Sequence, residues 1–208
     1  MIYDRDYFEN GLITGKSGYE NYRWIPELTI PLAMTIIDYI GIVRNDTVLD
    51  FGCAKGFLVK ALRWLRRDAY GCDISEYAVD HADPEVKEYL TRYLPTKKFT
   101  YCIAKDVFEH MEPDTLRYTL KAINAKILFA IVPLGEEGKF YAPMNNRDTT
   151  HQICFPSQWW INLFRGNGWT DIQFSYRVDG IKDKYYERYP EAHGFFLMRK
   201  ANDNDTEG

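Results

Sequence analysis

The sequence lacks paired cysteines. Its 208 residues contain four cysteines, Cys53, Cys72, Cys102 and Cys154, without the spacing of a zinc site or of a small disulfide framework. Three of them lie in or beside expected strands, so we expect buried thiols. Neither a metal nor a disulfide is assigned from these cysteines.

The sequence also lacks any accumulation of positive charge. Its 26 Lys and Arg residues against 30 Asp and Glu residues give a net charge of −4, and no run of Lys or Arg exceeds two residues. Nonspecific binding to phosphate backbones requires a basic face. A nucleic-acid partner is therefore not expected.

Long apolar stretches are missing as well. Even the stretch from Ile127 to Leu134 is far shorter than the roughly 18 residues of a membrane span. The opening residues MIYDRDYFEN are charged and have no apolar core of the kind found in signal peptides. We expect a cytoplasmic chain with no membrane partner.

Aromatic residues, in contrast, are abundant: 16 Tyr, 12 Phe and 5 Trp. An apolar fraction of 46% and a charged fraction of 27% are typical of a globular protein, and the length suits one sizeable domain. The aromatic side chains could fill a core or line a cleft for flat or sugar-like ligands. Composition alone favours the core.

Strand-like and helix-like patterns alternate along the chain. The expected strands are 47–51, 69–74, 99–104, 126–133, 169–178 and 194–199, and the expected helices are 27–40, 57–66, 76–82, 113–124 and 156–165. This alternation predicts an α/β domain with a Rossmann-like parallel sheet covered on both faces. The last two strands, without an expected helix between them, predict an antiparallel hairpin at one edge.

A glycine-containing turn follows the first expected strand, in the stretch VLDFGCAKGFLVKALR. In doubly wound sheets, ligands bind beyond the carboxyl ends of the strands. Gly52 and Gly56 would let a ligand approach the backbone, and Asp50 could accept hydrogen bonds from an amine or a hydroxyl. Asp73 ends the next strand and is placed to accept both hydroxyls of a ribose. The alternative is that the two glycines only shape a tight strand–helix junction.

The spacing Gly52-x-x-x-Gly56 differs from the G-x-G-x-x-G pattern that holds pyrophosphate. Asp50 would also be a poor neighbour for phosphates. An acidic turn suits a cationic nucleoside without phosphate, and S-adenosylmethionine has that chemistry.

The segments VLDFGCAKG, YGCDIS and DVFEHM resemble motifs of the class I S-adenosylmethionine-dependent methyltransferases over about residues 30–200. The opening Tyr7-Phe8-Glu9 and the pairing of Asp148-Thr149-Thr150-His151 with Trp159-Trp160 resemble a small-molecule branch found in bacteria and phages. The resemblance implies a seven-stranded sheet in the order 3-2-1-4-5-7-6. It also implies cofactor contacts from the turn and the strand ends, with Ile74 stacking on adenine. The full expected cofactor-binding set is Asp50, Gly52, Cys53, Ala54, Gly56, Asp73, Ile74 and Asp106.

One departure from the family concerns adenine. The family usually has an acidic residue after strand three, and this sequence has none there. Tyr89, Leu90 and Thr91 are the nearest candidates, so backbone groups alone would hold the adenine end.

Composition and the resemblance together divide the chain into three expected parts. They are an aromatic lid over 1–26, which would close on the cofactor and exclude water, a methyltransferase domain over 27–200 and a disordered tail over 201–208.

Candidate catalytic residues follow the fourth and fifth strands of that order. His151 lies in a polar segment after strand five, and His110 and Asp106 follow strand four; each is expected to act as a base or to contact the acceptor. An alternative for Asp106 and Glu109 is a helix-capping pair. Glu109, His110 and His151 could together bind a metal, but because there are only two histidines and they lie in unrelated segments, no metal is assigned.

The expected function is methyl transfer to a small-molecule or glycan acceptor, most simply at a hydroxyl. An N-methyltransferase, a nucleic-acid methyltransferase and a noncatalytic S-adenosylmethionine binder remain alternatives. The sequence does not indicate an oligomeric state.

Overall fold

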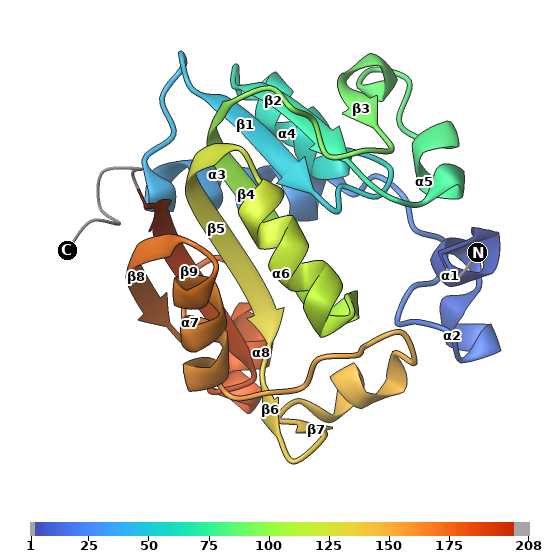
Figure 1. Ribbon diagram of the computed structural model, residues 1–208. Helices are drawn as coiled ribbons and strands as arrows, with labels where there is room; N and C mark the ends of the chain where they lie inside the picture. Colours follow the sequence, from blue (N-terminus) through green and yellow to red (C-terminus); the bar gives the residue numbers. More distant parts are fainter. Residues whose placement is uncertain (1–2, 202–208) are drawn as a thin grey trace.

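A seven-stranded sheet forms the centre of the chain, whose computed structural model describes residues 3–201 (Figure 1). Its strands are β1 (Thr47–Phe51), β2 (Asp68–Cys72), β3 (Leu90–Thr91), β4 (Phe99–Lys105), β5 (Ala125–Pro133), β8 (Trp169–Ser175) and β9 (His193–Lys200). They are ordered β3-β2-β1-β4-β5-β9-β8. Counted along the chain without the separate hairpin of β6 (Gly135–Glu136) and β7 (Lys139–Phe140), this is the order 3-2-1-4-5-7-6, and the predicted α/β fold is confirmed.

Strands β1 to β5 are parallel, whereas β9 runs antiparallel to both β5 and β8. The antiparallel pairing of the last two strands was predicted. The connection between them was not, because it contains the short helix α8 (Asp183–Arg188). Since β9 is antiparallel, its first residue His193 lies opposite Pro133, the last residue of β5.

The numbering of the middle strands needs one correction. The segment predicted as the third strand is β4, the fourth, because the two-residue β3 precedes it and pairs with β2. A strand of two residues is too short to leave a recognisable alternation in the sequence. The predicted adenine candidates Leu90 and Thr91 thus form the third strand itself.

Helices cover both faces of the sheet. They are α1 (Arg5–Glu9), α2 (Gly11–Thr14), α3 (Pro26–Ile40), α4 (Phe57–Trp64), α5 (Glu76–Asp80), α6 (Pro113–Ala122) and α7 (Ser157–Gly166), with α8 and the 3-10 turns η1 (Lys87–Tyr89), η2 (Phe108–His110) and η3 (Pro143–Arg147). Five of these match predicted helices, with ends shifted by a few residues. Helix α3 ends at Gly41 in the left-handed conformation that favours glycine (φ 75°).

The core has two layers because β5 is buried on both sides. Leu128, Ala130 and Val132 pack with α6 and α7, whereas Phe129 and Ile131 pack with α3 and α4. Alternate residues of a strand face opposite sides, so a strand covered on both faces must be apolar throughout. This explains the continuous hydrophobic run of β5.

Two predictions concern the ends of the chain. The predicted N-terminal segment forms α1, α2 and the loop before α3, while all but Ala201 of the predicted disordered tail lies outside the described residues. Within residues 3–201, the helices are too short or too polar to cross a lipid bilayer.

Candidate functional site

The turn between β1 and α4 adopts left-handed backbone at three positions. Gly52, Ala54 and Gly56 have φ angles of 79°, 49° and 79°. A β-carbon on Gly52 would lie 2.5 Å from Val107 Cγ2, and one on Gly56 would lie 2.7 Å from Leu90 Cδ1. The chain's own packing therefore requires both glycines. Their contact with a ligand stays a prediction.

Asp73 ties this turn to the end of β2. Its carboxylate accepts hydrogen bonds from the backbone N–H of Ala54 (2.7 Å) and of Ser75 (2.8 Å). Burial raises the pKa of Asp73, although both amides favour the ionised form. Each carboxylate oxygen keeps a second lone pair, so the group can still accept hydroxyl hydrogens.

Asp50, at the end of β1, is a buried carboxyl group with only 5% of its surface exposed. Burial raises its pKa to about 7; Lys105 opposes this shift and Asp73 adds to it. The described residues provide no hydrogen bond to its carboxylate. Asp50 is therefore a carboxyl group whose charge a cationic partner would stabilise.

The remaining residues predicted around the turn differ in exposure. Cys53 is buried, with its sulfur against the position that a β-carbon on Gly71 would occupy, so only its backbone could face a ligand. Ile74 is 72% exposed, which leaves its side chain accessible for the predicted stacking.

The aromatic N-terminal segment packs against these strand ends. Helices α1 and α2 lie beyond the carboxyl ends of the parallel strands (Figure 1). Burial raises the pKa of Tyr22, and the nearby carboxylates of Asp50 and Asp73 raise it further. Tyr7 donates a hydrogen bond to Asp148 (3.3 Å), and Glu9 forms an ion pair with Lys55 of the glycine turn. The segment is thus attached both to the turn and to the loop after β5.

Asp106 follows β4 and does not cap a helix, so the predicted capping pair is wrong. The turn η2 begins after Val107 without a side-chain cap, and Asp106 instead pairs with Lys105 (2.6 Å) and Lys182 (3.0 Å). Burial alone would raise the pKa of Asp106, but the two lysines outweigh it and hold that pKa well below its ordinary value. Such a carboxylate is a weak base and a stable negative charge.

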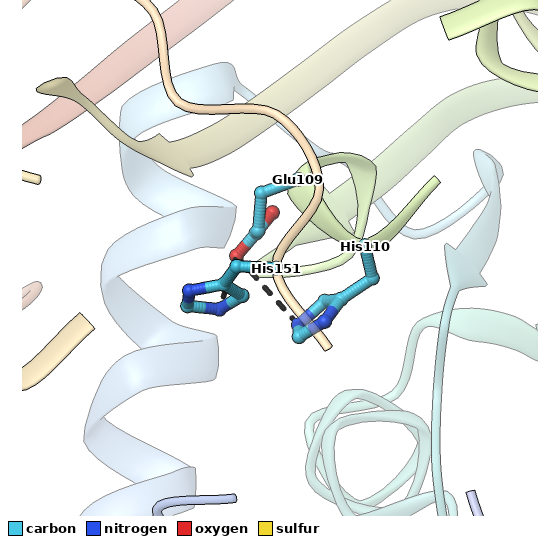
Figure 2. Close-up of side chains that lie close together, drawn as sticks. All are labelled: Glu109, His110 and His151. Atoms are coloured by element: carbon cyan, nitrogen blue, oxygen red, sulfur yellow. Dashed lines mark ion pairs between the residues drawn. The ribbon is translucent and has the colours of Figure 1, made fainter. Parts of the chain in front are cut away.

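Glu109, His110 and His151 meet next to Asp106, although residue 151 is distant in sequence. The Nε2 atoms of His110 and His151 each lie 4.0 Å from Glu109 Oε1. Both rings turn a nitrogen toward the same carboxylate oxygen (Figure 2). The backbone fixes this arrangement, because Gln152 N–H (2.7 Å) and Ile153 N–H (3.0 Å) both donate to the carbonyl of Glu109.

Burial controls the charge of this cluster. The Glu109 side chain is 1% exposed, and burial together with Asp106 raises its pKa well above the ordinary value. Burial lowers the pKa of His110 to about 4, aided by His151, and burial also lowers the pKa of His151. Both imidazoles are therefore neutral near pH 7.

The hydrogen bonds of the two rings identify their tautomers. His151 Nδ1 lies 2.8 Å from the carbonyl oxygen of Asn145, which can only accept, so Nδ1 carries the proton. His110 Nδ1 lies 2.8 Å from Thr150 Oγ1, whose own hydrogen is donated to Asp148 (2.6 Å). Both rings therefore have a free lone pair on Nε2, directed toward Glu109.

The comparison with known proteins found no matching family model and no matching curated relative. Solved structures do match. An S-adenosylmethionine-dependent methyltransferase from Archaeoglobus fulgidus aligns with a TM-score of 0.62 at 14% identity, over 81% of this chain and 93% of its own. One from Clostridium acetobutylicum aligns with a TM-score of 0.63 at 11% identity, over 93% and 96%.

The fold is that of S-adenosylmethionine-dependent methyltransferases. Within this methyltransferase fold, a Haemonchus contortus phosphoethanolamine N-methyltransferase, solved with phosphomonomethylethanolamine and S-adenosylhomocysteine, aligns with a TM-score of 0.60 at 13% identity. That alignment covers 82% of this chain and 52% of the other. At such identities the likeness concerns the fold.

The sequence did not predict the two lysines that pair with Asp106. Lys182 precedes α8, has φ 60° and lies 3.1 Å from His193 Nε2, while its ammonium pairs with Asp106. No sequence pattern indicates this contact, because it depends on β9 bringing its first residue to the end of β5. Lys105 immediately precedes the DVFEHM motif, so its charge next to Asp106 is visible in the sequence.

Proposed function

We propose that the chain is an S-adenosylmethionine-dependent methyltransferase that acts on a small-molecule or glycan acceptor, most simply at a hydroxyl. The observation that carries the proposal is the pair of carboxylates at neighbouring strand ends. Asp50 is buried without a hydrogen-bond partner among the described residues, and Asp73 is held by the turn it faces. Together they suit the amine and ribose hydroxyls of a nucleoside that carries positive charge.

The reaction itself needs alignment. The acceptor oxygen attacks the methyl carbon in line with the breaking C–S bond, S-adenosylhomocysteine leaves, and the hydroxyl proton passes to a base. His110 and His151 are neutral and have free Nε2 lone pairs, which supports a role in accepting that proton. Asp106 is better suited to hold charge than to remove a proton.

The N-terminal segment supports a lid role in this proposal. It contacts Lys55 of the turn and Asp148 of the loop that also carries His151. A segment attached to both places could exclude water from the cofactor and the acceptor.

Calorimetry with S-adenosylmethionine and S-adenosylhomocysteine tests cofactor binding. We expect one molecule bound per chain, with affinity at least about tenfold lower in Asp73→Asn, because hydrogen bonds to a charged group are lost. Asp114→Asn is the matched control, since that side chain is fully exposed at the start of α6. A folded wild-type chain that binds neither ligand would overturn the proposal.

A methyl-transfer assay over sugars, phenols and amines then tests the acceptor. Loss of rate with a hydroxyl acceptor in His110→Ala or His151→Ala supports transfer to oxygen. Unchanged rates in both variants would contradict the base, and turnover with amines alone would favour N-methylation. Cofactor binding without turnover on any acceptor would indicate a noncatalytic binder.

A further inference from the structure

The Glu109 carboxylate is a buried acceptor that lacks a hydrogen-bond partner at one of its two oxygens. Its side chain is 1% exposed, and Oε2 has no hydrogen-bond partner among residues 3–201. Leaving such a group without a partner costs about 1–3 kcal/mol, and more for a charged group. Oε1 lies 4.0 Å from the Nε2 atom of each imidazole, which is too far for a hydrogen bond.

The arrangement of these three side chains matches a different kind of partner. One ligand atom from each of Glu109, His110 and His151 lies within 4.8 Å of the other two. Each Nε2 offers a lone pair, as the hydrogen bonds at both Nδ1 atoms require, and the Glu109 carboxyl offers lone pairs alone once a cation displaces its proton. Three acceptors directed at one point suit a cation.

We propose that Glu109, His110 and His151 bind a divalent transition-metal ion. Two imidazoles and one carboxylate are typical ligands of zinc and of other first-row divalent ions, whereas Mg²⁺ and Ca²⁺ prefer oxygen ligands alone. With three protein ligands, a tetrahedral ion keeps a fourth position for water or substrate.

The distances fit with a small contraction. Ligand bonds of about 2.0–2.1 Å around a tetrahedral ion place ligand atoms about 3.3 Å apart. The present 4.0 Å between Glu109 Oε1 and each Nε2 would shorten by roughly 0.7 Å. Side-chain rotation supplies such a movement without displacing the backbone that holds Glu109.

The groups behind the histidines support the same conclusion. A metal-bound imidazole usually donates its other N–H to a carbonyl, carboxylate or similar acceptor, which fixes the ring. His151 donates to the carbonyl of Asn145, and His110 donates to Thr150, which in turn donates to Asp148. Both rings are therefore oriented before any ion binds.

The role of the ion in catalysis rests on the proposed function. Glu109 and His110 follow β4, and His151 lies in the loop after β5. The cluster is therefore next to Asp106, on the predicted acceptor side of the site. An ion there would bind the acceptor hydroxyl in its fourth position and lower the pKa of that hydroxyl. Because both Nε2 atoms are then ligands, the ion takes over the activation of the hydroxyl from the histidines, and the proton passes to a water molecule. The binding site itself stands on the three side chains alone.

Calorimetry with Zn²⁺ on a chelator-treated, tag-free chain tests the site, and Co²⁺ absorption reports its geometry. We expect one ion per chain, with at least tenfold weaker binding in Glu109→Gln and in His151→Ala. Thr150→Val keeps all three ligands and removes the partner of His110, so a tenfold or greater loss is also expected. His81→Ala, an exposed histidine after α5, and Cys154→Ser, the least buried cysteine, should bind like wild type.

Thermal unfolding and S-adenosylhomocysteine binding show that each variant is folded. If a ligand variant fails to fold, Thr150→Val and the Co²⁺ spectrum of the wild type decide the outcome. Absence of stoichiometric Zn²⁺ binding, or equal binding by wild type, Glu109→Gln and His151→Ala, would overturn the inference. Loss of Zn²⁺ binding with intact S-adenosylhomocysteine binding leaves the proposed function standing. Zn²⁺ binding without S-adenosylhomocysteine binding would support the metal site and contradict the proposed function.

Discussion

At the scale of single residues, Asp50 has the clearest physical consequence. Its carboxyl is buried at a strand end and has a pKa of about 7 instead of the ordinary 3.8. Between about pH 4 and pH 7, Asp50 is therefore protonated in the folded chain and ionised in the unfolded chain. The contribution of Asp50 to stability is present below pH 4 and is lost as the pH rises through 7.

A cationic cofactor should reverse this preference, since its positive charge favours ionised Asp50. We expect the affinity for S-adenosylmethionine to rise about eightfold between pH 6 and pH 7.5, with release of a proton on binding. Calorimetry in two buffers of different ionisation enthalpy measures both quantities. Asp50→Asn should bind more weakly and with a flat profile. A profile that stays steep in Asp50→Asn would contradict this origin.

The residues of the site differ in how well they could be predicted. Asp50 and Asp73 were found because parallel strands place their carboxyl ends along one edge, so the strand assignments located both. Lys182 was not found, because its contact with Asp106 links distant parts of the chain. Glu109, His110 and His151 do not read as a metal site in the sequence, since the sequence does not reveal that the loop after β5 returns to β4.

At the scale of elements, the N-terminal segment is small but well attached. Ser75 of the α5 cap donates a hydrogen bond to the carbonyl of Tyr3 (2.6 Å), and Tyr77 of α5 donates to Glu9 (3.1 Å). Helices α1 and α2 have five and four residues. Helices this short depend on tertiary contacts for their stability.

Binding of S-adenosylhomocysteine should therefore slow hydrogen exchange in this segment. We expect at least about fivefold slower exchange for amides of residues 5–22, because ligand binding suppresses local opening. Amides of α7, which packs on the far part of the sheet, serve as the internal control. Equal exchange in both states would show that the segment is fixed independently of the cofactor.

Sequence patterns predicted the long buried elements better than the short ones. The long buried strand β5 was predicted almost completely, because burial on both faces requires a continuous apolar run. The two-residue β3 and the six-residue α8 were missed, because neither spans enough residues to show a period. Their existence depends on packing against neighbours.

At the scale of the whole molecule, two fully buried tryptophans stabilise the same layer of the core in different ways. Trp160 and Trp169 both have no exposed surface. Trp169 Nε1 donates to the carbonyl of Leu120 (3.1 Å), whereas Trp160 Nε1 finds no acceptor among residues 3–201. Substitution by Phe removes a similar apolar area in each case.

We expect Trp169→Phe to lower the free energy of unfolding by about 1 kcal/mol more than Trp160→Phe, since only the former loses a hydrogen bond. Urea unfolding at pH 7 measures both values, and equal m-values show that the same surface is exposed. A larger loss for Trp160→Phe would mean that its N–H is satisfied in solution.

The place of β9 between β5 and β8 affects how the chain is made. During synthesis from the N-terminus, β5 leaves the ribosome about sixty residues before its partner, so one apolar edge of the nascent sheet stays open during that interval. Asp106 pairs with Lys105 from the start, but its second cationic partner, Lys182, is made only in the same late interval. Chaperones that recognise open strand edges would act on this protein chiefly in that interval.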